Sequence, residues 1–133
     1  MSDPKDLQIH IMRSELGRAR GMGAAKSGVH HWTAQRVTAI ALVPLILWFI
    51  YSLLSLGHAP HEAVLAWASG PLTLVLLLTL AGTMFYHMQL GLQVVIEDYV
   101  HNEASKLIAI LLMKGAAILL AITAIISILK IGL

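Results

Sequence analysis

Three long apolar segments, separated by short polar stretches, constrain this chain more than any other feature of its sequence. They cover about residues 37–56, 71–96 and 107–129. A helix needs about 20 apolar residues to cross the hydrocarbon core of a bilayer, and each segment reaches that length. A spanning segment must satisfy its backbone polar groups internally, so we expect three transmembrane helices.

The composition agrees with a membrane protein of a single domain. The 133 residues are 58% hydrophobic and 12% charged, whereas a soluble domain carries about 25% charged residues. Lipid is therefore the expected solvent for most of the surface, and the length suits one domain, residues 1–133. The sequence has no cysteine, which excludes disulfides, iron–sulfur ligation and thiolate zinc sites within this chain.

Short connections are predicted between the three helices. Residues 57–70 are predicted to be a loop, and residues 97–106 a second, shorter connection. Pro71 suits the first position of a helix, and Pro44 inside the first span is expected to kink it. Helices joined in this way form an up-down-up bundle, so the predicted fold class is an all-α membrane protein.

Basic residues gather before the first apolar segment. Six of the nine Lys and Arg residues lie within residues 1–36, and none lies in the 57–70 connection. The positive-inside rule then places the N-terminus and the 97–106 connection in the cytoplasm, or in the matrix of a mitochondrion. We expect residues 1–28 to form a flexible polar arm that docks on a soluble partner or on lipid headgroups. Acidic residues and the lack of an aromatic stacking platform argue against nucleic acid.

His87 is the only histidine inside the predicted spans. An ionisable side chain at membrane depth is costly and points to function by default. On an ideal helix, Gly91 and Asp98 lie within about 40° of His87. Gly91 leaves a notch that admits either the edge of a porphyrin or a neighbouring helix. Three uses of His87 remain open from spacing alone: an interhelical hydrogen bond, haem ligation and proton transfer. A bis-histidine haem would need its second ligand from another polypeptide.

The stretch 87–99 carries a more specific pattern: His87, three residues, Gly91, six residues, then Asp98 and Tyr99. This pattern resembles the signature of the small hydrophobic membrane-anchor subunits, of cytochrome b556 type, of succinate dehydrogenase (respiratory complex II). Residues 27–40 resemble the stretch that opens the first span in that family, and three spans follow in the same order. The resemblance covers nearly everything after residue 26.

The resemblance implies roles for five residues. His87 matches an axial ligand of haem b, whose other ligand comes from the larger of the two membrane-anchor subunits. Tyr99 matches a tyrosine that donates a hydrogen bond to a carbonyl of ubiquinone, and Asp98 its acidic neighbour in the quinone pocket. Arg36 matches an arginine near the haem propionates and the quinone pocket. His30 matches a polar residue of the same surface.

The residue types suit this chemistry, although each has a simpler use. A phenol can donate a hydrogen bond to a quinone carbonyl, and a guanidinium can bind a carboxylate through two parallel hydrogen bonds. Without the family pattern, Tyr99 is an ordinary interfacial tyrosine, Asp98 ends a helix, and Arg36 is a topology signal.

The resemblance implies an anchor subunit of succinate:quinone oxidoreductase in a bacterial inner membrane, bound to the larger membrane-anchor subunit, an iron–sulfur subunit and a flavoprotein subunit. The chain carries no dinucleotide fingerprint or cluster ligands, so it cannot oxidise succinate alone. Three alternatives remain: the anchor of a quinol:fumarate reductase, a structural scaffold without cofactor, and a small transport or proton-conducting protein that uses His87, Asp98 and Lys114. We expect Lys114 to snorkel toward the cytoplasmic interface, with a haem propionate as its alternative partner.

Overall fold

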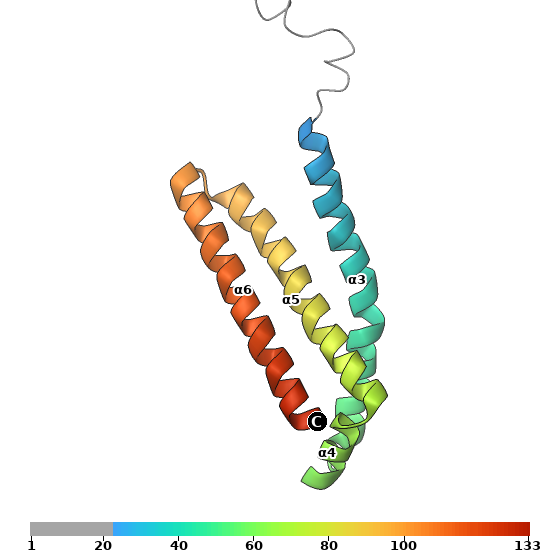
Figure 1. Cartoon of the computed structure of the whole chain (residues 1–133). Coiled ribbons are helices and arrows are strands. Elements are labelled where there is room, and N and C mark those ends of the chain that lie inside the picture. Colours follow the sequence, from blue (N-terminus) through green and yellow to red (C-terminus); the bar gives the residue numbers. More distant parts are fainter. Residues whose placement is uncertain (1–22) are drawn as a thin grey trace, which may run out of the picture. The chain divides into compact units, whose positions relative to one another are not determined.

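Three long helices dominate the structure. A computed structural model of the chain describes residues 23–133, with side chains from residue 28 onward. Helices α3, α5 and α6 are long and apolar enough to span a membrane, which confirms the predicted fold class. The described residues form four helices and no strand: α3 (Gly23–Leu56), α4 (His61–Ala68), α5 (Pro71–Tyr99) and α6 (Glu103–Gly132) (Figure 1).

Helix α3 begins well before the predicted start of the first span at residue 37. It starts at Gly23, and its membrane-length apolar part covers Gly28–Leu56. The sequence boundary was wrong because polar residues near the start of a span do not prevent helix formation. His30 therefore lies inside this apolar helix, and the expectation that His87 is the only histidine of a span is also wrong. Pro44 lies inside α3 without ending it.

The predicted N-terminal arm falls largely outside the described residues. Its residues 1–22 are not described, and residues 23–28 belong to α3 instead of a flexible segment. Residues 34–133 form one compact unit, and the start of α3 up to Thr33 is described by itself. The assignment of the whole chain to one domain stays a prediction.

The connection after α3 contains a short helix where a loop was predicted. Helix α4 follows Pro60, which occupies the N-cap position in an extended conformation. The ring of Trp67 in α4 stacks on the ring of Trp48 in α3, with centroids 5.9 Å apart and planes inclined by 25°. Such an aromatic pair contributes about 0.5–1.5 kcal/mol beyond its buried area. This contact holds α4 against α3.

Helices α5 and α6 lie side by side as an antiparallel pair (Figure 1). Pro71 is at the N-terminus of α5, as predicted. The connection between the helices is only residues 100–102, and Asn102 caps α6 by accepting a hydrogen bond from the backbone N–H of Ser105 at 3.0 Å. Such a cap stabilises a helix by about 1 kcal/mol. The short, capped turn fixes the two helices as neighbours.

Few side chains are buried within the described chain. In the most apolar windows of the three spans only 6–11% of residues are buried. An exposed apolar surface of this extent is expected where helices meet lipid or the helices of another subunit. The buried apolar residues are Leu42, Ala68, Leu80, Ala81, Leu90 and Ala117.

Gly132, in the last turn of α6, lies close to Leu74 of α5 and Ala68 of α4. A Cβ atom there would lie 2.5 Å from Cδ1 of Leu74 and 3.3 Å from the carbonyl oxygen of Ala68. We expect Gly132→Ala to be less stable than Gly115→Ala by about 1 kcal/mol, because the added methyl group must displace the Leu74 side chain and press on the Ala68 carbonyl. Thermal unfolding of the purified complex measures this change.

Gly115→Ala is the matched control on the same helix, because a Cβ atom at Gly115 meets nothing within 4 Å. Alanine favours a helix interior over glycine by roughly 0.5–1 kcal/mol, so this variant should be as stable as the wild type or more so. Equal destabilisation by the two substitutions would contradict the close approach at Gly132.

Candidate functional site

His87 lies deep in α5, as the sequence predicts. It is 12 residues before Tyr99, so about 18 Å of helix separates it from the C-terminal end of α5 at 1.5 Å per residue. Its side chain is half-buried. At this depth water does not compete for the imidazole, so its two nitrogens take their partners from protein or from a bound group.

One ring nitrogen of His87 bonds to α3. Nδ1 lies 2.8 Å from Oγ1 of Thr38. The same hydroxyl lies 2.7 Å from the carbonyl oxygen of Ala34 and 3.1 Å from that of Gln35. A carbonyl only accepts, and a hydroxyl carries a single hydrogen. Thr38 therefore donates to its own helix and accepts a hydrogen bond from Nδ1–H of His87.

The interhelical hydrogen bond that spacing left open is thus present, and it does not exclude ligation. A neutral imidazole with its proton on Nδ1 carries a lone pair on Nε2, which is the state a metal ligand requires. Nε2 has no hydrogen-bond partner among the described residues and reaches the surface of the chain. The donor chemistry therefore fits one axial position of a haem that is shared with another polypeptide.

No group of three metal-ligating side chains occurs among the residues that the structure describes. An axial haem position needs a single imidazole from this chain, so His87 alone meets that requirement. A metal centre built entirely from described side chains of this chain has no support.

Gly91 faces α3 one turn from His87. A Cβ atom at Gly91 would lie 3.5 Å from Nε2 of Gln35, which is an ordinary van der Waals distance. The side chain of Gln35 on α3 therefore borders the notch at Gly91.

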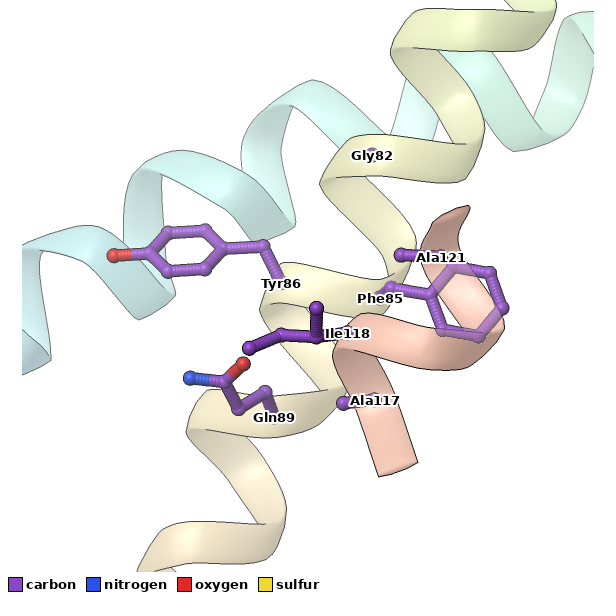
Figure 2. A pocket seen from close by; sticks show the side chains of 7 residues that line it. All are labelled: Gly82, Phe85, Tyr86, Gln89, Ala117, Ile118 and Ala121. Atoms are coloured by element: carbon purple, nitrogen blue, oxygen red, sulfur yellow. The ribbon is translucent and has the colours of Figure 1, made fainter. Parts of the chain in front are cut away.

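Helix α6 lies on the other face of α5. Phe85 and Gln89 point about 160° away from His87 on an ideal helix, and both line a shallow cavity of about 180 Å³ between α5 and α6 (Figure 2). The α6 side of this cavity is formed by Ala117, Ile118 and Ala121, so its wall is mainly apolar. His87 faces α3 and takes no part in the cavity.

Lys114 belongs to α6 and is therefore separated from His87 by α5. It lies 11 residues after Glu103, about 16 Å along α6, so its depth resembles that of His87. Within residues 28–133 it makes no hydrogen bond or ion pair. No described hydrogen bond connects Lys114, His87 and Asp98, so the proton-relay alternative gains no support.

Asp98 and Tyr99 form the last turn of α5, which continues past the predicted end of the second span at residue 96. Both side chains are exposed, and Tyr99 exposes 78% of its surface. Neither makes a hydrogen bond within the described residues. A quinone pocket at this position therefore needs walls from other subunits.

Arg36 is not brought together with Tyr99 in this chain. Arg36 is exposed and lies about 200° around α3 from Thr38 and about 3 Å along the axis. It therefore shares the depth of His87, whereas Tyr99 lies about 18 Å further along α5. His30 is exposed, in the part of α3 that is described by itself.

Most of this chain matches a known family of membrane proteins. Residues 10–128 match the succinate dehydrogenase/fumarate reductase transmembrane subunit family. The chain belongs to this family. A succinate dehydrogenase hydrophobic membrane anchor subunit of Rickettsia bellii is 37% identical over 116 residues, which cover 87% of this chain and 93% of that protein.

Two further relatives carry related names. A Rickettsia conorii succinate dehydrogenase hydrophobic membrane anchor subunit is 38% identical over 93 residues, covering 69% of this chain and 74% of the relative. A succinate dehydrogenase membrane anchor subunit of Reclinomonas americana is 30% identical over 96 residues, covering 70% and 80%. The predicted family is therefore confirmed, and with it a membrane subunit of a larger complex.

Sequence reasoning missed Thr38 as a contact of His87 in the candidate site. Its contact joins residues 49 positions apart in the chain, and a single sequence does not show which faces of two helices meet. The available signal was a hydroxyl side chain inside an apolar span. It is weak, because Thr79 and Thr123 also lie in spans and bond only to their own helices.

Proposed function

We propose that this chain is the hydrophobic membrane-anchor subunit of a succinate:quinone oxidoreductase. The family match and the names of the relatives support this assignment. In this role the chain attaches the flavoprotein and iron–sulfur subunits to a bacterial inner membrane and packs against the larger membrane-anchor subunit. The Lys and Arg distribution favours a cytoplasmic N-terminus, which puts the end of α5 on the cytoplasmic side.

The chain contributes one axial ligand of haem b through Nε2 of His87. The observation that carries this proposal is the hydrogen bond between Nδ1 and Thr38, because it leaves the lone pair on the other nitrogen at the chain surface. When bound, haem supplies a one-electron carrier between helices. The chain's own contribution is to hold the imidazole at a fixed depth and in one tautomer.

Tyr99 and Asp98 form this chain's share of the ubiquinone site. Quinone reduction takes two electrons and two protons, and the Tyr99 phenol donates a hydrogen bond to a quinone carbonyl. The exposure of both side chains at the end of α5 supports a pocket that other subunits complete. Arg36, whose guanidinium can bind a carboxylate through two parallel hydrogen bonds, is proposed to lie near the haem propionates and the quinone pocket.

Purification of the complex through a tag on this chain tests the proposal. The preparation should contain flavoprotein and iron–sulfur subunits, reduce ubiquinone with succinate, and show low-spin b-type α and Soret bands in the reduced-minus-oxidised spectrum. A complex that holds the catalytic subunits but shows no haem bands would support the anchor role and contradict the haem assignment. The same assay run with quinol and fumarate addresses the fumarate reductase alternative.

A further inference from the structure

We infer that Thr38 is a positioning residue that selects the tautomer of His87 and sets the electron donation of its Nε2 to iron. This inference rests on the proposed function. The supporting geometry is the chain of two hydrogen bonds, from Nδ1 of His87 to Oγ1 of Thr38 at 2.8 Å and from that hydroxyl to the carbonyl oxygen of Ala34 at 2.7 Å.

The hydrogen bond from Thr38 to the Ala34 carbonyl determines which atom donates in the bond between Thr38 and His87. With its hydrogen on the Ala34 carbonyl, the Thr38 hydroxyl presents only lone pairs to His87, and only an N–H can satisfy them. The proton of the imidazole is thus held on Nδ1. A hydroxyl that already donates is also polarised, which makes it a better acceptor for the next bond in the chain.

This arrangement has two consequences for a ligand. It fixes the ring plane from α3, so the Nε2 lone pair has one direction before any group binds. It also raises the basicity of the imidazole, because an acceptor on the second nitrogen of a metal-bound histidine increases donation from the first. Stronger donation favours ferric over ferrous iron, so Thr38 lowers the midpoint potential of the haem.

Thr38→Val removes the hydroxyl and keeps the shape of the side chain. In the purified complex we expect the equilibrium between ferric and ferrous haem at a fixed ambient potential to shift toward ferrous by up to about tenfold, since the full strength of one neutral hydrogen bond is the upper limit for its difference between the two oxidation states. Tenfold corresponds to about 59 mV for one electron. The low-spin electron paramagnetic resonance signal of the ferric haem should shift as well, because the ring is no longer held in one orientation.

Two controls separate the hydroxyl from general effects. Thr38→Ser keeps the hydroxyl and should retain the wild-type potential. Thr79→Val removes a hydroxyl that also bonds to its own helix, to the carbonyl oxygen of Val75 at 2.7 Å, and that makes no bond to a histidine. It should leave the potential and the signal unchanged.

Failure of the proposed function is read from other measurements, namely the wild-type spectrum for the presence of haem and the His87→Leu spectrum for the ligand. A normal haem in Thr38→Val with unchanged potential and signal would overturn the inference and leave the ligand assignment intact. Loss of haem in Thr38→Val, with haem retained in Thr38→Ser and Thr79→Val, would support it. A serine variant as altered as the valine variant would overturn it, because the methyl group and not the hydroxyl would then matter.

Discussion

Replacement of His87 by leucine is expected to remove the low-spin b-type spectrum from the purified complex. Leucine keeps an apolar side chain of similar size in the span but has no lone pair for iron. An iron left with a single axial imidazole loses the bis-histidine, low-spin state. The reduced-minus-oxidised spectrum of the variant, normalised to flavoprotein, measures the effect.

The complex should stay assembled in this variant although its haem bands are lost. His87→Leu also removes the bond to Thr38, which contributes about 0.5–1.5 kcal/mol. Native gels should therefore still show the assembled complex. His101→Leu is the matched control, because His101 is exposed in the short connection after α5 and should retain the full spectrum. A normal spectrum in His87→Leu would exclude His87 as the ligand.

Replacement of Tyr99 by phenylalanine is expected to lower the kcat/KM for ubiquinone about tenfold. The variant removes one hydrogen bond to the quinone carbonyl, and a loss of about 1.4 kcal/mol of transition-state binding corresponds to that factor. The ring stays, so the α5 end, the haem spectrum and the assembly should be unaltered. Steady-state assays with succinate and a soluble quinone measure the change.

Tyr86→Phe provides the control for this substitution. Tyr86 lies on the same helix and exposes 45% of its surface beside the cavity shared with α6. Loss of its hydroxyl should not affect quinone kinetics. Unchanged kinetics in Tyr99→Phe would remove Tyr99 from the quinone site, whereas an equal effect of both substitutions would indicate a general change in α5.

The sequence predicted the parts of the fold that depend on hydropathy and on residues that begin or end helices. The three spans and the start of α5 at Pro71 follow from apolar length and from the proline that marks a boundary, whereas the connection predicted at residues 97–106 is shorter because both helices continue into it. The start of α3 and helix α4 were missed, because a helix continues through polar residues and because stacking of Trp67 on Trp48 is a tertiary contact.

The candidate site was predictable in its parts but not in its connections. The depth of His87 and the exposed Asp98–Tyr99 pair follow from helix length and from position along α5. The partner of His87 does not, because a single sequence does not show which face of α3 is turned toward α5. Gln93 illustrates the same limit: the sequence does not show which partner its amide takes, and in the structure it donates to Glu97 on its own helix at 2.8 Å.

An experimental density map of the assembled complex would show both nitrogens of the His87 ring together and so decide how this histidine is used. We expect Nε2 to be bonded to a haem iron whose opposite axial ligand is a histidine from another polypeptide, with Nδ1 still directed at the Thr38 hydroxyl. A map with both nitrogens of His87 on protein atoms, and a haem held by other residues or absent, would contradict the ligand assignment.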